Sequence, residues 1–119
     1  MLPASIDFPC RRNADYGEVL YFSDGPEQIS LSGLTFKMDV RLYPNGPLVF
    51  TVSLPVTDGG VTVRFDRSTL RNAFDGASAQ KNNGVVELVH DITVTHPDDF
   101  IEVWAEGKVT IEAGVTVNA

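Results

Sequence analysis

The chain has 119 residues, of which 43% are hydrophobic and 21% charged, a composition typical of a single globular domain. Sixteen acidic against nine basic residues give a formal net charge of -7, which would repel a phosphate backbone and excludes nucleic acid as an expected partner. The single cysteine, Cys10, excludes an intrachain disulfide scaffold and a zinc site closed by thiolates. Because the sequence has no secretion-signal pattern and no run of about 18 apolar residues, we expect a product of the cytoplasm with no membrane partner.

The first predicted elements are two short strands, at 18–23 and 29–31, around the turn Ser23-Asp24-Gly25-Pro26. The clearest signal follows at 34–42, where apolar and polar residues alternate with a period of two. This period predicts a strand with one buried and one polar face.

A hairpin is predicted at Tyr43-Pro44-Asn45-Gly46-Pro47, because Asn-Gly accepts positive φ angles and the prolines interrupt strand pairing. The return strand is predicted at 48–54. After a break at Asp58-Gly59-Gly60, alternation resumes at 61–65, so the three segments together predict a three-stranded meander.

A short helix is predicted at 66–74. Asp66 is placed to cap it with its side chain, and Leu70 and Phe74 fall on one face. The polar segment 75–84 predicts an exposed, mobile loop.

Two further strands are predicted, one at 86–94 and, after a turn at 96–99, another that starts at Ile101. Alternate positions of the second strand are apolar as far as Ala113, and Gly107 predicts a bulge or bend that divides it in two.

These elements predict an all-β fold, an antiparallel two-sheet immunoglobulin-like β-sandwich with one short helix near 66–74. We expect one domain over 1–119, with residues 1–15 as an extended N-terminal docking segment.

The two histidines are candidate chemical groups, and each has a structural alternative. His90 could act as a general base, but its apolar neighbours favour a hydrogen-bonded core histidine. His96 could bind a metal ion with Asp98 and Asp99, but the missing calcium-loop spacing favours a solvated turn.

Cys10 is followed by Arg11 and Arg12, which would favour a nucleophilic thiolate, yet no base is near in sequence and a structural cysteine is favoured. The arginines could instead dock a partner's carboxylates or simply be solvated. Since no nucleophile elbow, phosphate-binding loop or zinc-protease motif occurs, we expect no enzyme activity, no metal and no cofactor.

The single tryptophan offers a binding alternative. Trp104 lies between Glu102 and Glu106 in alternate positions, and an exposed indole beside carboxylates can stack on a sugar ring. A tryptophan packed under a loop or against a second sheet is favoured over this platform.

Four segments carry a family resemblance: Ile6-Asp7-Phe8-Pro9-Cys10-Arg11-Arg12, the Leu-x-Gly and Met-x-Val-Arg spacing within 29–41, Val89-His90-Asp91-Ile92-Thr93-Val94-Thr95-His96-Pro97, and Ala105-Glu106-Gly107-Lys108-Val109-Thr110-Ile111. In this order they resemble a group of small phage and prophage proteins, mostly encoded among tail and tail-fibre genes. Asn13-Ala14-Asp15 stands where that group usually has Gly-Asp. His90 replaces a common aromatic residue, which favours its core interpretation.

The resemblance implies a virion structural protein of the tail, baseplate or fibre-attachment region, made in the bacterial host and located in the virion. It implies no catalytic residues. We expect it to bind other tail proteins and copies of itself through sheet edges and an N-terminal segment, with Phe8, Pro9, Arg11 and Arg12 as docking residues. The alternative is a carbohydrate-binding module that uses Glu102, Trp104 and Glu106.

Overall fold

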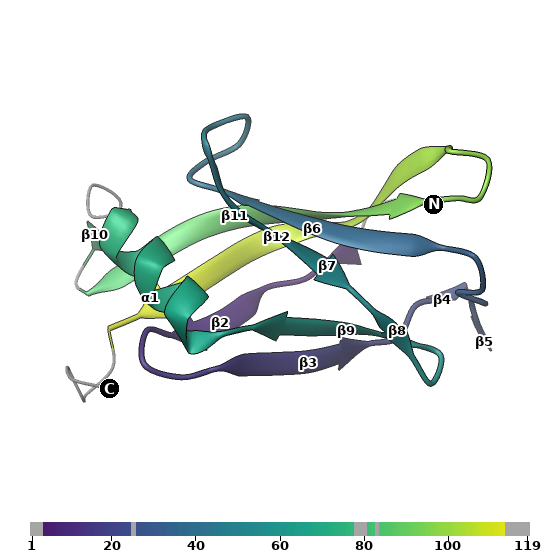
Figure 1. Ribbon diagram of the computed structural model, residues 1–119, viewed down its shortest axis with the longest axis horizontal. Coiled ribbons are helices and arrows are strands. Elements are labelled where there is room, and N and C mark those ends of the chain that lie inside the picture. The colour runs from purple at the N-terminus through teal and green to yellow at the C-terminus, as the bar shows by residue number, and fades with distance from the viewer. Residues whose placement is uncertain (1–3, 25, 78–80, 83, 114–119) are drawn as a thin grey trace.

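The computed structural model describes residues 4–24, 26–77, 81–82 and 84–113, and in these two β-sheets face each other across a core (Figure 1). Sheet A, the larger one, consists of β1 (Ala4–Ser5), β2 (Phe8–Arg11), β6 (Thr35–Arg41), β7 (Leu48–Leu54), β10 (Lys81–Asn82), β11 (Val85–Thr95) and β12 (Ile101–Glu112). Sheet B consists of β3 (Tyr16–Leu20), β8 (Val56–Thr57) and β9 (Gly60–Phe65), while β4 (Ser23–Asp24) and β5 (Glu27–Gln28) form a small ribbon. The described helix is α1 (Arg67–Gly76).

The predicted all-β class, with two sheets and one short helix, is confirmed. In sheet A the strands lie in the order β1-β12-β11-β6-β7, with β2 also beside β12, and in sheet B in the order β3-β9-β8. Pairing is antiparallel except that β1 and β2 run parallel to β12, which corrects the prediction of a purely antiparallel sandwich. Residues 4–5 and 8–11 of the N-terminal segment are therefore part of the sheet.

The hairpin between β6 and β7 forms as predicted, with Asn45 at a φ of 61°. The predicted meander is wrong, because β9 pairs with β3 and β8 and not with β7. Pro55 ends β7 and has no N–H to extend the ladder, and its carbonyl accepts a hydrogen bond from the Thr62 N–H at 2.8 Å as the chain crosses to sheet B. This crossing leaves β7 at the edge of sheet A.

The early strands differ from their predicted positions. β3 covers 16–20 and not 18–23, and residues 29–31 are not in a strand, because the chain makes the β4–β5 ribbon before them. The predicted loop at 75–84 is partly helix and partly strand, since α1 continues to Gly76 and β10 (Lys81–Asn82) pairs with β11. Its residues 78–80 and 83 lie outside the described part of the chain.

The start of α1 is fixed by a distant residue. Asp66 occupies the N-cap position but its side chain makes no cap hydrogen bond, which corrects the predicted cap. The Arg67 N–H donates instead to Asp15 Oδ1 at 2.6 Å, from the loop before β3. As predicted, Leu70 and Phe74 are buried on one face of the helix.

β12 runs without interruption through Gly107, so the prediction that this glycine divides the strand is wrong. The irregularity lies at Trp104, which is the extra residue of a β-bulge against β11. One extra residue inverts the alternation of faces. Ile101 and Val103, before the bulge, are therefore 63% and 37% exposed, whereas Trp104 is 5% exposed.

The core lies between the two sheets and under α1. Its largest fully buried side chains are Phe8, Phe65, Met38, Leu70, Leu88, Ile92, Ile111, Val40, Val61, Val63, Val86 and Val94. Within the described ranges, no helix is both long enough and apolar enough to cross a membrane.

Candidate functional site

The predicted docking residues at the N-terminus separate into core and surface positions. Phe8 is 0% exposed, and its ring makes edge contacts with Tyr16 and Phe65, with centroids 5.9 Å apart in both cases. This placement corrects the prediction that Phe8 docks a partner, because a parallel β2 turns alternate side chains into the core. Pro9, the next residue, is exposed.

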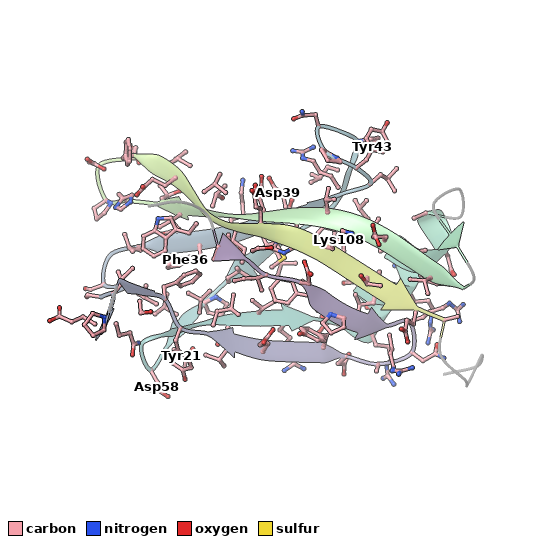
Figure 2. All side chains as sticks on the ribbon, turned by 180° about the vertical axis from the view of Figure 1, so that it is seen from behind. Tyr21, Phe36, Asp39, Tyr43, Asp58 and Lys108 are labelled. Carbon is pink, nitrogen blue, oxygen red and sulfur yellow. The ribbon has the colours of Figure 1, made fainter. Side chains whose placement is uncertain are left out.

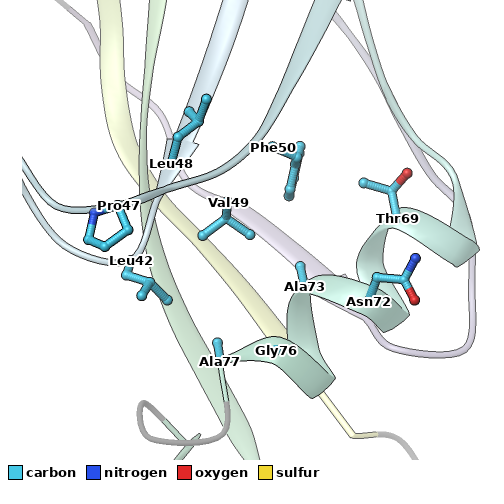
Figure 3. A pocket seen from close by; sticks show the side chains of 10 residues that line it. All are labelled: Leu42, Pro47, Leu48, Val49, Phe50, Thr69, Asn72, Ala73, Gly76 and Ala77. Atoms are coloured by element: carbon cyan, nitrogen blue, oxygen red, sulfur yellow. The ribbon is translucent and has the colours of Figure 1, made fainter.

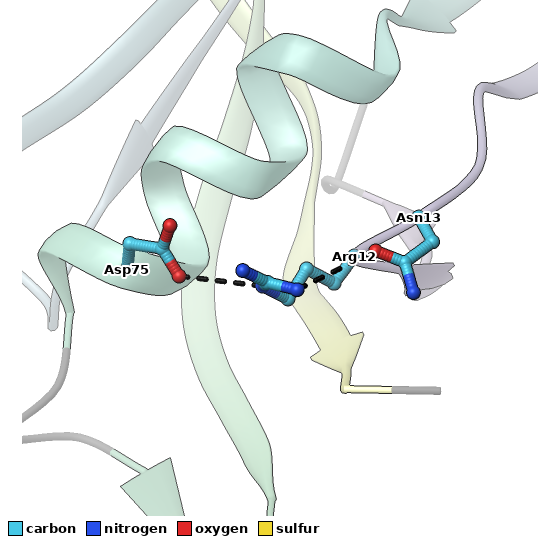
Figure 4. A network of polar contacts seen from close by, with 3 residues as sticks. All are labelled: Arg12, Asn13 and Asp75. Atoms are coloured by element: carbon cyan, nitrogen blue, oxygen red, sulfur yellow. Dashed lines mark hydrogen bonds and ion pairs between the residues drawn. The ribbon is translucent and has the colours of Figure 1, made fainter. Parts of the chain in front are cut away.

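The two arginines have partners within the chain. Arg11 Nη1 lies 3.5 Å from Glu112 Oε2, and both side chains are largely exposed. Arg12 Nε donates to Asp75 Oδ1 of α1 at 3.3 Å, and Nη1 reaches Asn13 Oδ1 at 3.5 Å (Figure 4). Arg12 therefore joins the end of β2 to the helix, while Arg11 and Pro9 remain on the surface.

The predicted sugar platform is not assembled. Trp104 packs edge-on against Phe22 and Phe36, with ring centroids 5.3 and 5.7 Å away. The bulge at Trp104 places the indole in the core and Glu106 on the outer face of sheet A, while Glu102 lies beyond the bulge. Burial of the indole corrects the carbohydrate-binding interpretation, because a ring that stacks on sugar must be open to solvent.

His96 and Glu102 form a close pair at the β11–β12 turn, with Nε2 and Oε1 2.6 Å apart. The hydrogen bond from His96 lowers the pKa of Glu102. Asp98 Oδ1 accepts the Phe100 N–H at 3.1 Å, and Asp99 has a φ of 69°. Among the described residues, no three His, Cys, Asp or Glu side chains are grouped so that they could hold a metal ion.

His90 is 4% exposed and faces the core. Its Nε2 lies 2.6 Å from the Ile6 carbonyl oxygen, and since a carbonyl only accepts, Nε2 carries the proton. Nδ1 is buried and has no hydrogen-bond partner among the described residues. Burial lowers the pKa of His90, so the ring is a neutral core group.

Gly107 makes this contact possible. A Cβ at Gly107 would collide with the Ile6 carbonyl oxygen. Asp7 Oδ1 accepts a hydrogen bond from the Lys108 N–H at 3.0 Å. In the gap between β1 and β2, this carboxylate oxygen replaces a backbone carbonyl as the acceptor. The Ile6 carbonyl is thereby available to His90.

Cys10 is 3% exposed and its Sγ lies 3.6 Å from the Phe8 carbonyl oxygen. Burial raises the pKa of the Cys10 thiol to about 12, which disfavours the thiolate that a nucleophile needs.

The feature that sequence reasoning missed is a row of three carboxylates across the outer face of sheet A. Asp91 of β11 pairs in register with Asp39 of β6 on one side and with Glu106 of β12 on the other. Asp91 Oδ1 is buried and has no hydrogen-bond partner among the described residues. Burial, followed by repulsion from Asp39, raises the pKa of Asp91.

This carboxylate row forms part of the floor of a concavity of about 520 Å³ that also includes Gly107 and is bounded by Pro44 and Asn45 of the β6–β7 hairpin. Figure 2 shows Asp39 on this side of the sheet and Tyr43 on the hairpin that rises beside it. The concavity contains the three carboxylates together with two cations, Arg41 and Lys108, so it has an excess of one negative charge.

The cations next to the carboxylate row have contacts of their own. Arg41 and Lys108 lie in the adjacent row of sheet A and line the same concavity. Arg41 Nη1 donates to the Gly46 carbonyl at 3.1 Å, and Lys108 Nζ lies 3.2 Å from Glu87 Oε1.

The alternation of β6 and β11 indicated outward acidic residues, but only the pairing register brings the carboxylates together.

Comparison with known proteins gives no family for this chain: no protein-family model matches it, and neither does any curated protein.

Proposed function

We propose that this protein is a non-enzymatic structural protein of a phage or phage-derived tail, in the tail, baseplate or fibre-attachment region of the virion. It acts by protein–protein assembly, with other tail proteins and copies of itself as partners, and without cofactor, nucleic acid or membrane. The four segments that resemble tail-region proteins support this assignment.

The observation that carries the proposal is the carboxylate row in the concavity of sheet A. Like charges directly opposite on neighbouring strands destabilise a sheet, so a row of three has a cost in folding. A basic group of a neighbouring protein would offset this repulsion by pairing with the exposed Glu106 at one end of the row. The net charge of -7 also favours a basic neighbour.

The residues that could carry catalysis support a non-enzymatic role. His90 is engaged by the Ile6 carbonyl inside the core, and the Cys10 thiol is buried with a raised pKa. Neither group combines access to substrate with the ionisation state that a base or nucleophile needs.

We further propose that the sandwich is immunoglobulin-like. In support, β3 and β9 pair in one sheet, and the consecutive strands β6 and β7 lie beside β11 and β12 in the other, as the corresponding strands do in variable-type immunoglobulin domains. The short helix α1 joins the two sheets between β9 and β11.

Particle incorporation tests the proposed function. The triple variant Asp39→Asn/Asp91→Asn/Glu106→Gln removes three charges from the row, and we expect it to fold but to be depleted at least about tenfold from purified particles, as measured by mass spectrometry. The matched control, Glu27→Gln/Asp58→Asn/Asp66→Asn, removes three exposed charges elsewhere and should be incorporated normally. A wild-type chain that is absent from purified particles refutes the assignment.

A further inference from the structure

Strand β7 is an edge strand with an unusual composition. Its sequence, Leu48-Val49-Phe50-Thr51-Val52-Ser53-Leu54, contains no charged residue, proline or glycine. No described strand pairs with its outer side. Proteins normally protect a long edge strand with charges, prolines or a cover, because its free N–H and C=O groups can pair with another strand.

The other edges of the described sheets are protected. β3 contains Gly17 and Glu18, and β8 has only two residues. The edge formed by β1 and β2 is interrupted between them and contains Pro9, which has no N–H. The contrast indicates that β7 is kept free for pairing.

The regular part of β7 is its second half. An extra residue at Val49 disturbs the pairing with β6, and from Phe50 to Leu54 the register is regular. An apolar groove of about 430 Å³ lies between α1 and the beginning of β7, and its lining includes Leu48, Val49 and Phe50 of the strand and Ala73 of the helix (Figure 3). The helix therefore flanks the beginning of the strand and leaves Thr51 to Leu54 outside the groove.

Resting on the proposed assembly function, we propose that β7 pairs antiparallel with β7 of a second copy of this chain, about a two-fold axis at Val52. In this register Phe50 lies opposite Leu54 of the second copy, and Thr51 lies opposite Ser53. Residues that lie directly opposite each other in an antiparallel ladder are on the same face of the sheet. The core-facing side chains of β7 in the two copies therefore lie on one face of the joined sheet.

Charge favours a second copy as the occupant. Two chains that each carry a net charge of -7 repel, and this repulsion is smaller where the facing surfaces have no acidic side chain, as along β7. Lys37 pairs with Ser53 and Asp39 pairs with Thr51 within one chain. Across the two paired β7 strands, each cross-strand row therefore runs from Lys37 and Ser53 of one copy to Thr51 and Asp39 of the other. The two ends of each row carry opposite charges.

Sedimentation of the purified full-length chain tests the interface. The variant Thr51→Lys/Ser53→Lys places lysines opposite each other in two rows, and we expect its dimer dissociation constant to rise at least about tenfold. Thr51 and Ser53 are exposed. Thr51 Oγ1 donates to Asp39 Oδ1 at 2.9 Å, and a lysine at this position can pair with the same carboxylate, so the folded monomer should tolerate both changes. The control Ser30→Lys/Ser32→Lys adds the same charge at exposed loop positions and should dimerise as the wild type does.

Crosslinking tests the register. Thr51→Cys chains mixed with Ser53→Cys chains should form a disulfide-linked dimer, whereas Thr51→Cys alone should crosslink at least about tenfold less, because Thr51 and its copy lie two residues out of register. A wild-type monomer at every concentration overturns this inference, even if the chain is found in particles and the proposed function stands. A dimer that is insensitive to both lysines and does not crosslink places the interface elsewhere and also overturns the inference.

Discussion

At the scale of single residues, His90 connects the N-terminal segment to the core of sheet A. The residue is 84 positions from Ile6 in the sequence, yet its Nε2 donates to the Ile6 carbonyl oxygen at 2.6 Å. The ring also packs on Phe8, with centroids 4.9 Å apart. A neutral imidazole is required here, because a proton on the buried Nδ1 would find no acceptor among the described residues.

His90 should make the protein sensitive to acid. Burial lowers its pKa in the folded state from 6.5, so below that pH the unfolded chain binds a proton that the folded chain resists, and stability falls. We expect the wild type to lose up to about 2 kcal/mol between pH 7.5 and pH 5, relative to His90→Gln, which keeps an N–H donor but does not titrate. Urea unfolding at both pH values measures this difference, and parallel pH profiles of the two proteins would contradict it.

At the scale of secondary-structure elements, the ends of the elements depend on residues outside them. α1 obtains its N-terminal acceptor from Asp15, which precedes β3, and not from its own Asp66. β2 is joined to the end of α1 through Arg12 and Asp75. The helix is therefore positioned by the loop that connects the N-terminal segment to sheet B.

Removing the side chain of Asp15 and removing that of Asp66 should lower the stability of the protein by different amounts. We expect Asp15→Ala to destabilise the protein by about 1 kcal/mol, because the Arg67 N–H loses its acceptor. Asp66→Ala should cost less, because among the described residues the Asp66 side chain contacts only Arg64, in an exposed pair at 3.6 Å. Equilibrium unfolding of the two variants gives the comparison, and a larger loss for Asp66→Ala would restore the local cap predicted from sequence.

At the scale of the whole molecule, the distribution of acidic residues reduces the stability of the fold. The chain has an excess of acidic residues, and three of them share one row of sheet A. The charged form of Asp91 is disfavoured by burial and by Asp39. Such an arrangement resembles a binding surface, where stability is sacrificed for recognition.

Asp91→Asn should stabilise the isolated protein at pH 7, because the neutral amide removes a partly buried negative charge. The gain should shrink as the pH falls towards 4, since the raised pKa of Asp91 means that the folded wild type takes up a proton before the unfolded chain does. Urea unfolding at pH 7 and pH 4 measures the change. Glu87→Gln is the control on the same face, and because Glu87 lies 3.2 Å from Lys108 Nζ it should bring no gain; an equal gain in both variants would contradict the role of Asp91.

A feature of this fold could be predicted from the sequence when it depends on residues that are close together in the chain. Local alternation and the Asn45-Gly46 turn gave β7 its bounds of 48–54, and the same period identified His90 as a core residue. These predictions succeed because the face that a side chain takes along a strand depends on its near neighbours.

The features that only the tertiary structure decided involve partners far apart in the chain. The bulge at Trp104 inverts the faces of β12, the crossing after Pro55 leaves β7 at an edge, and Asp15 caps α1. The carboxylate row exists only because three strands align in one register. The sequence by itself determined the strands β6, β9 and β11 and their buried faces. Register and sheet membership, and with them the candidate binding surfaces, came from long-range pairing that a local pattern cannot encode.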